Sequence, residues 1–289
     1  MSVDRWRKFI HMDKRIIYLI MCIGVVAPMF MTFGLPITVE RPMQDFFNVI
    51  ENLPPDSIVV VAHEASPSQI SEFKPMLICL MTHIYQKGHR IVIQSFWAQG
   101  NALALEWSKS AFEANGMIYG TDYVCVGYRT GLTAIMDGAR TNYINAYSDR
   151  DHYGNTLSTM PVMRGFEKAS DIGLVVIFTG GSPGVGEYIS NWQSRGDVMN
   201  MIACAAAVQI PPEMVRYQAG MLQGICGGMS GAAQYEKIMG MPGSATSGMD
   251  SQGIGHLTII LLVILGNIGY FIIRNAEAKE RASRDAAVS

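Results

Sequence analysis

Charged residues are scarce in this sequence. Of its 289 residues only 16% are Asp, Glu, Lys or Arg and 49% are hydrophobic, whereas soluble domains carry about 25% charged residues. This composition excludes an intrinsically disordered chain, which would be polar and highly charged. The net charge of −2 provides no basic surface of the kind that nucleic-acid binding requires. We therefore expect a folded protein without a nucleic-acid partner.

Cysteine is also scarce. The five cysteines form no Cys-x-x-Cys or similarly close pair, so their spacing indicates neither a zinc site nor a disulfide framework. We expect no bound metal and no resident cofactor, and the alternative is a phosphate-containing ligand. The cysteines are Cys22, Cys79, Cys125, Cys204 and Cys226.

Two apolar runs without a charge lie near the ends of the chain. Residues 16–37 are 22 such residues, enough for a helix that crosses a hydrocarbon core of about 30 Å. This run lacks the small-residue cleavage site of a signal peptide, so it predicts an uncleaved signal anchor. Residues 257–273 form a second run of 17 residues, which we predict to be a second transmembrane helix. A buried core helix is the alternative for the second run.

Basic residues flank both apolar runs. Five precede the first run in residues 1–15, and four follow the second in residues 274–289. By the positive-inside rule both termini are expected in the cytoplasm, with residues 38–255 on the other side of the cell membrane. The lipid bilayer is thus an expected partner. The basic residues are Arg5, Arg7, Lys8, Lys14, Arg15, Arg274, Lys279, Arg281 and Arg284.

Residues 38–255 alternate short β-branched runs with segments of helical periodicity. Continuous apolar strands are typical of parallel sheets covered on both faces. The alternation predicts a doubly wound, mostly parallel, Rossmann-like α/β domain between the two transmembrane helices. Strands are predicted at residues 57–62, 90–95, 122–127, 171–179 and 198–207, and helices at residues 67–87, 102–115, 132–140, 185–193 and 211–239.

Residues 141–170 interrupt this alternation. A connection of such length in a compact domain is usually functional or disordered, and its aromatic residues argue against disorder. We predict a lid or a partner-binding insertion. Within it, Asp149, Asp151 and His152 could hold a metal ion, although a polar turn is the alternative.

A glycine-rich loop at residues 179–192 is the main ligand-site candidate. It connects a predicted strand to a predicted helix, where backbone N–H groups can bind an anion. The loop matches neither the P-loop nor the dinucleotide-binding motif, so a tight structural turn is the alternative. The candidate residues are Gly180, Gly181, Ser182, Gly184, Gly186 and Glu187.

The ends of other predicted strands carry four further candidates. His63, Glu64, Ser66 and Arg129 follow the first and third strands, and carboxyl ends of parallel strands meet at one crevice. His63 and Glu64 could form an acid/base pair, and Arg129 could bind a carboxylate or phosphate. Ser66 could instead cap a helix. A hydrolase or transferase would use His63, Glu64 and Ser182.

The predicted helix at residues 211–239 contains many glycines. Each glycine inside a helix costs about 1 kcal/mol relative to alanine, a cost that close helix–helix packing could offset. We predict a homo-oligomer interface here, and tight packing on the sheet is the alternative. The interface candidates are Gly220, Gly224, Gly228, Gly231, Met221 and Met229.

The segment GMLQGICGGMSGAAQYEKIMGMPGSATSGMDSQGIGHL resembles uncharacterised prokaryotic membrane-anchored proteins with a Rossmann-like domain, mainly over residues 211–260. The resemblance implies the same layout and transfers no catalytic residue. We predict a membrane-anchored α/β domain that serves as a structural, assembly or interaction subunit and associates with itself, rather than an enzyme. The alternatives are an extracytoplasmic binding or sensor module for a small anion, and a hydrolase or transferase.

Overall fold

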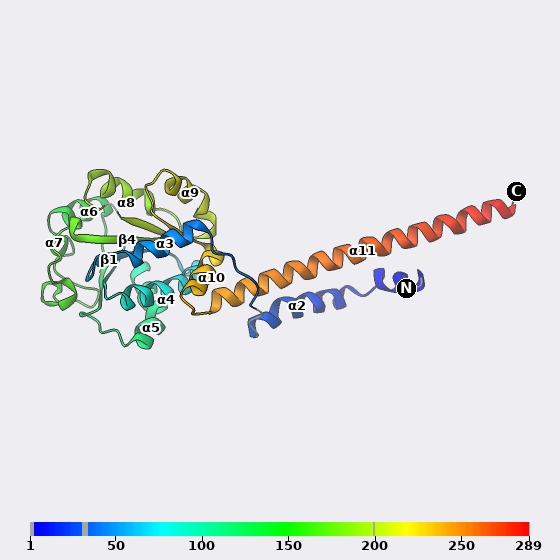
Figure 1. Cartoon of the computed structure of the whole chain (residues 1–289), viewed down its shortest axis with the longest axis horizontal. Coiled ribbons are helices and arrows are strands. Elements are labelled where there is room, and N and C mark those ends of the chain that lie inside the picture. Colours follow the sequence, from blue (N-terminus) through cyan, green and yellow to red (C-terminus); the bar gives the residue numbers. More distant parts are fainter. Residues whose placement is uncertain (1–2, 31–33, 199, 289) are drawn as a thin grey trace. The chain divides into compact units, whose positions relative to one another are not determined.

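The computed structural model describes residues 3–30, 34–198 and 200–288 (Figure 1). The chain forms two compact units. One is Pro36–Thr246, and the other combines Met1–Leu35 with Ser247–Ser289.

The first unit is built on a six-stranded sheet in which every strand pair is parallel. The strand order is β3-β2-β1-β4-β5-β6, which is the order of Rossmann-like sheets. The predicted α/β class is therefore confirmed. The strands are β1 Ile58–Glu64, β2 Arg90–Ser95, β3 Tyr123–Tyr128, β4 Ile172–Thr179, β5 Met201–Ala205 and β6 Ile225–Gly227.

Helices cover both faces of this sheet, which explains its continuous apolar strands. All seven residues of β1 are buried, as expected for a parallel strand between two helical layers. One layer contains α4 (Ile70–Gln86), α5 (Gly100–Asn115) and α10 (Gly228–Ile238), and α3 (Arg41–Glu51) packs beside β6. The other layer contains α6 (Leu132–Thr141), α7 (Tyr143–Ala146), α8 (Val185–Asn191) and α9 (Ile210–Gln218) (Figure 1).

The predicted single helix at residues 211–239 is wrong. Helix α9 ends at Gln218, residues 225–227 pair with β5 as the edge strand β6, and α10 begins at Gly228. Gly220 and Gly228 have φ values of +76° and +58°, which the interior of an α-helix does not allow. The glycines thus interrupt the helix, and they do not need a second helix to offset their cost. Helix α3 and strand β6 were not predicted.

Several side chains of the 141–170 segment pack into the core, which does not suit the predicted lid, and the partner-binding role predicted as the other possibility stays a prediction. Tyr143, Tyr147, Leu157, Val162 and Phe166 are all at most 2% exposed and belong to the same apolar cluster as the strands. Helix α7 and short 3-10 turns carry these side chains over the sheet. Tyr143, Tyr147 and Phe166 therefore cover strands and are not available to a partner, whereas Tyr153 is 63% exposed.

Among the described residues one helix is long and apolar enough to cross a membrane. It is the part of α11 (Ser244–Val288) at Ser244–Ser283, which contains an 18-residue window with a mean hydropathy of 2.2. This helix includes the predicted span at 257–273, and its apolar side chains are mostly exposed, as at Leu257 (64%) and Val263 (56%). The helix begins at Ser244, so the Gly/Ser-rich residues 244–256 before the predicted span are helical.

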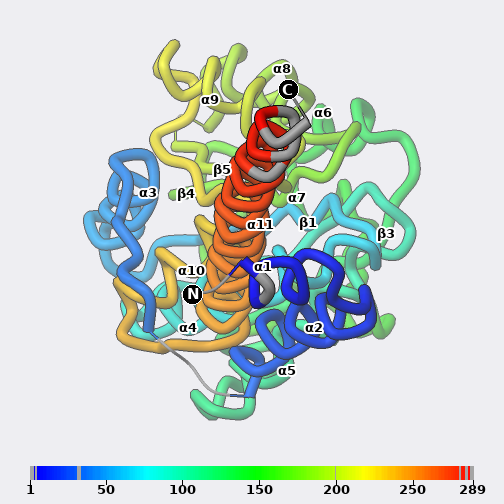
Figure 2. The backbone as a smooth tube through the Cα atoms, turned by 90° about the vertical axis from the view of Figure 1, so that its right-hand side faces the viewer, coloured from blue at the N-terminus to red at the C-terminus, as the bar shows by residue number. Residues whose placement is uncertain are grey.

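The first predicted span is only partly helical in the described residues. Helix α2 is Lys14–Phe30, 17 residues long, and residues 34–40 are not helical; residues 31–33 lie outside the described part of the chain. The described residues therefore contain one candidate membrane helix where two were predicted. Helices α2 and α11 lie side by side in this unit (Figures 1 and 2), where a Cβ on Gly24 would lie 2.9 Å from Thr258 Oγ1.

Candidate functional site

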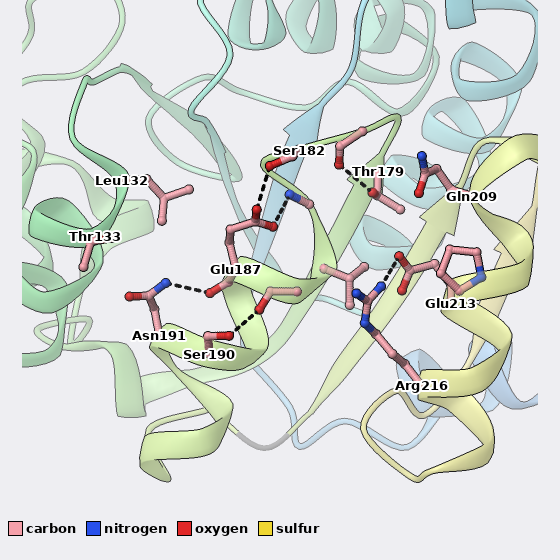
Figure 3. A pocket seen from close by; sticks show the side chains of 15 residues that line it. Leu132, Thr133, Thr179, Ser182, Glu187, Ser190, Asn191, Gln209, Glu213 and Arg216 are labelled. Atoms are coloured by element: carbon pink, nitrogen blue, oxygen red, sulfur yellow. Dashed lines mark hydrogen bonds and ion pairs between the residues drawn. The ribbon is translucent and has the colours of Figure 1, made fainter.

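A cleft of about 570 Å³ opens at the carboxyl edge of the sheet, between helices α8 and α9 (Figure 3). The carboxyl end of β4 contributes Thr179, and the loop and helix that follow it contribute Ser182 and Glu187. Helix α9 contributes Glu213 and Arg216. Helices α8 and α9 follow the neighbouring strands β4 and β5, and in open α/β sheets ligands bind outside the carboxyl ends of the strands.

The Glu187 side chain is hydrogen-bonded to the glycine-rich loop that precedes its own helix. Its carboxylate accepts a hydrogen bond from Ser182 Oγ (2.7 Å) and another from the backbone N–H of Gly184 (2.8 Å) (Figure 3). Burial acts to raise the pKa of Glu187, but these two hydrogen bonds and the charge of Arg216 outweigh it, so its pKa lies below the ordinary value. The Glu187 carboxylate thus occupies one of the backbone donors at which an anion was expected, that of Gly184, and its own negative charge disfavours a lone anion there.

Glu213 and Arg216 form an ion pair on α9. Arg216 Nη1 donates to Glu213 Oε1 at 2.5 Å, while Glu213 Oε2 is buried and has no hydrogen-bond partner among the described residues. Burial raises the pKa of Glu213, and the Glu187 carboxylate raises it further, against the opposing effect of Arg216. The guanidinium group lies next to Gly186, where a Cβ would be 3.2 Å from Arg216 Nη2. The absence of a side chain at residue 186 makes room for it.

Most of the predicted loop residues meet in this cleft. Gly181, Ser182, Gly184, Gly186 and Glu187 all line it. Gly180 instead packs against the Gln69 side chain, which a Cβ at this position would overlap.

Comparisons of this chain with models of known families, with curated proteins and with solved structures find no match. The geometry of the cleft is therefore the basis for assigning a function.

His63 and Glu64 do not form the predicted acid/base pair, because consecutive residues of a strand point to opposite faces of the sheet. His63 is fully buried among the rings of Phe73, Trp107 and Phe178, and its Nδ1 lies 2.9 Å from the Gly100 carbonyl oxygen. Burial lowers the pKa of His63 to about 4, although the hydrogen bond to Gly100 opposes this shift.

Glu64 lies on the other face and organises a buried polar network. Its carboxylate accepts hydrogen bonds from the backbone N–H groups of Phe96 and Trp97, from Ser95 Oγ and from the Tyr188 hydroxyl at 2.8 Å. Burial raises the pKa of Glu64 to about 7, against these hydrogen bonds. Neither His63 nor Glu64 lines the cleft, so neither adds a titratable group to it.

Arg129 and Ser66 also make structural contacts. The Arg129 guanidinium donates to the backbone carbonyls of Tyr128 (2.9 Å), Tyr147 (3.0 Å) and Arg150 (3.2 Å). These hydrogen bonds connect the end of β3 to residues 147–150, which follow α6 and α7. The backbone N–H of Ser66 donates to Gln69 Oε1 at 2.9 Å, in the helical turn that precedes α4.

The acidic residues of the 141–170 segment stabilise turns. Asp149 accepts hydrogen bonds from the backbone N–H and the hydroxyl of Ser158. Asp151 accepts them from Tyr119 and from Asn155. In the described parts of the chain, no three His, Cys, Asp or Glu side chains are placed to hold a metal ion.

The glycines of the predicted oligomer interface have contacts within the chain. A Cβ on Gly224 would overlap the backbone of Phe46 in α3, and one on Gly231 would lie 2.9 Å from the Cys226 carbonyl carbon. Gly220 and Gly228 occupy turns of positive φ, Met221 is exposed, and Met229 is half-buried. These contacts account for the glycines without a second copy, and self-association stays a prediction.

Sequence reasoning missed the part of the cleft that α9 contributes. Glu213 and Arg216 are three residues apart, so they share one face of a helix, and this helix directly follows β5. The first turns of helices that follow parallel strands lie at the carboxyl edge of the sheet. Glu213 in the first turn of α9, with Arg216 three positions later, was the available signal.

Proposed function

We propose that this protein is a membrane-associated binding module whose α/β unit holds a small polar molecule in the cleft between α8 and α9. The observation that carries the proposal is the Glu213–Arg216 pair at the wall of this cleft, with one carboxylate oxygen that no described residue satisfies. The volume of about 570 Å³ lies within the range of about 300–1,000 Å³ typical of small-molecule sites.

The uncharged side chains that line the cleft support a polar occupant. The cleft is lined by hydroxyl and amide side chains, while Leu132 and Val185 provide apolar contact. Such a lining can bind several hydrogen-bonding groups and hold them in one orientation. The cleft thus suits recognition of a small molecule rich in donors and acceptors. Its polar residues other than the charged ones are Thr133, Thr179, Ser182, Ser190, Asn191, Gln209.

Filling the cleft tests this function. Ser190 lines the cleft and is exposed, so Ser190→Trp is expected to block binding while the fold is kept. The full chain in detergent is screened by thermal unfolding against amino acids, monosaccharides, nucleotides, dicarboxylates and inorganic phosphate. A bound probe at a hundredfold excess over Kd raises the free energy of unfolding by about 2.7 kcal/mol, and Ser190→Trp removes this increase.

Ser110→Trp is the matched control, because Ser110 is exposed on α5 and is not part of the cleft lining. The control variant is expected to respond to the same probe as the wild type does. The proposal is rejected if no probe stabilises the wild type, or if Ser190→Trp responds as strongly as the wild type.

We also propose that both α2 and α11 cross the membrane, with both termini in the cytoplasm. Helix α2 has no charged residue after Arg15, and Leu19, Met29 and Phe30 are 59%, 65% and 85% exposed. Its 17 residues extend about 26 Å at 1.5 Å per residue, near the lower limit for a span. The basic residues outside both helices support this orientation.

Epitope tags test the topology. In intact cells, tags at the two termini are expected to be protected from protease, and a tag inserted beside Gly154 is expected to be accessible. Residues 152–155 are all exposed in the α/β unit, so an insertion there leaves the core in place. A chain with one span would put the two termini on opposite sides, and accessibility of one terminal tag alone would contradict the proposal.

A further inference from the structure

Glu213 Oε2 is the most unusual polar atom of the cleft. The Glu213 side chain is only 2% exposed, and Arg216 satisfies only Oε1. Oε2 makes no hydrogen bond within the described residues. A buried polar atom without a partner is unfavourable because its hydration is lost without compensation, and more so when it is charged. Glu213 lines the cleft, although Oε2 itself is covered by the surrounding chain. A ligand that enters the cleft can supply the missing donor once the carboxylate turns toward it.

The charges of the cleft indicate which donor this is. The lining contains three charged side chains, those of Glu187, Glu213 and Arg216, so two carboxylates and one guanidinium give a formal charge of −1. A lone anion would meet a net negative wall there. An ammonium group would supply the donor and compensate the charge, and charge-assisted hydrogen bonds are stronger than neutral ones.

Arg216 gives the cleft a second recognition group. Nη1 is bound to Glu213, and the guanidinium extends from α9 toward α8 beside Gly186 (Figure 3). The side chain is 33% exposed, and a guanidinium group carries five N–H donors. It can therefore bind a carboxylate while it remains paired with Glu213. An acceptor and a donor thus lie next to each other on one wall.

We infer that the occupant is a small zwitterion of the amino-acid type. Its ammonium group donates to Glu213 Oε2, and its carboxylate accepts from Arg216. In an α-amino acid both groups are attached to one carbon atom, so they can face an adjacent acceptor and donor. The Glu187 carboxylate adds negative charge near the ammonium group while it remains hydrogen-bonded to Ser182 and Gly184. This inference rests on the proposed binding function of the same cleft.

Matched probes test the ligand class on the full chain in detergent by isothermal titration calorimetry. The probes are the amino acids, the N-acetyl derivative of each one that binds, and the corresponding amine without its carboxylate. Inorganic phosphate, dicarboxylates and monosaccharides are titrated in parallel. At least one amino acid is expected to bind, and loss of either the ammonium or the carboxylate group is expected to raise Kd at least about tenfold.

Two variants connect the affinity to the residues. Glu213→Gln keeps the size of the side chain and removes its charge, and it is expected to raise the Kd of the amino acid about tenfold or more. Arg216→Lys keeps the charge but loses the planar fork, and it is expected to weaken binding of the amino acid more than binding of the carboxylate-free amine. Glu106→Gln, on the exposed side of α5, is the matched control with unchanged Kd.

The outcomes separate this inference from the function on which it rests. The inference is overturned if phosphate, a dicarboxylate or a sugar binds in a manner that Ser190→Trp blocks while no amino acid binds, and the binding function then stands. It is also overturned if an N-acetyl derivative binds the wild type as tightly as its parent amino acid, a result that does not depend on how well any variant folds. If no probe of any class binds, the binding function and the ligand class fall together.

Discussion

Removal of Glu64 and removal of His63 are expected to change the pH dependence of stability in opposite directions. Relative to the wild type, the free energy of unfolding of Glu64→Gln rises by about 3 kcal/mol between pH 4.5 and pH 7. That of His63→Asn falls by about 3 kcal/mol between pH 4 and pH 6.5. In the wild type the opposite effects of these two neighbouring residues on the pH dependence of the free energy of unfolding nearly cancel.

The direction in which Glu64 changes the free energy of unfolding with pH follows from its raised pKa. Its carboxyl group has a pKa of about 7 in the folded chain and 4.5 as the ordinary value, so the folded state binds more protons between these pH values. The contribution of Glu64 to stability is complete below pH 4.5 and is lost as the pH rises to 7. A difference of about 2.5 pKa units corresponds to about 3 kcal/mol.

His63 changes the free energy of unfolding with pH in the opposite direction. Its imidazole has a pKa of about 4 in the folded chain and 6.5 as the ordinary value, so the unfolded state binds more protons in this range. The contribution of His63 is complete above pH 6.5 and is lost as the pH falls to 4. Because His63 and Glu64 lie on opposite faces of β1 in different side-chain environments, each group can be removed separately.

Urea unfolding of the full chain in detergent, followed by tryptophan fluorescence at several pH values, measures both effects. Trp107 and Trp192 are buried in the α/β unit and report its unfolding. Other titrating groups are common to the wild type and the variants, so the difference between two curves isolates the residue that was replaced. Glu106→Gln gives the background of an exposed Glu-to-Gln change. Difference curves without a slope would contradict the assignment.

Gly224→Ala is expected to lower the free energy of unfolding by about 3 kcal/mol. The added Cβ would overlap the backbone N and Cα of Phe46 in α3, and backbone atoms cannot turn away as the end of a flexible side chain can. Helix α3 must therefore move off β6, a case of overpacking whose usual cost is about 1–3 kcal/mol. Urea unfolding and the mass of the detergent-solubilised protein are measured together.

Gly116→Ala is the control for this substitution. Gly116 has a φ of +64° and no atom near the position of its Cβ, so the control has only the backbone cost, of about 1 kcal/mol. Equal stabilities of the two variants would contradict the contact between Gly224 and α3. If Gly224→Ala instead converts an oligomer to a monomer without a loss of stability, Gly224 belongs to the interface between copies that residues 211–239 predict.

The local sequence pattern was enough to predict the α/β class, because a parallel strand buried on both faces needs a continuous run of apolar residues. Strand β2 was predicted with its observed bounds, at residues 90–95, and β4 was predicted to within one residue. The glycine-rich loop at the end of β4 was correctly identified as part of a strand-to-helix connection at the edge of the sheet.

Contacts distant in the sequence decided the rest. Residues 225–227 became a strand only because β5 is there to pair with them, and Gly224 has no side chain because α3 packs against it. Glu187 and Glu213 are 26 positions apart, and they face one cleft because α8 and α9 follow neighbouring strands. Side-chain periodicity records which face of an element is buried. It does not record which other element covers that face, so the cleft and its charges follow only from the fold.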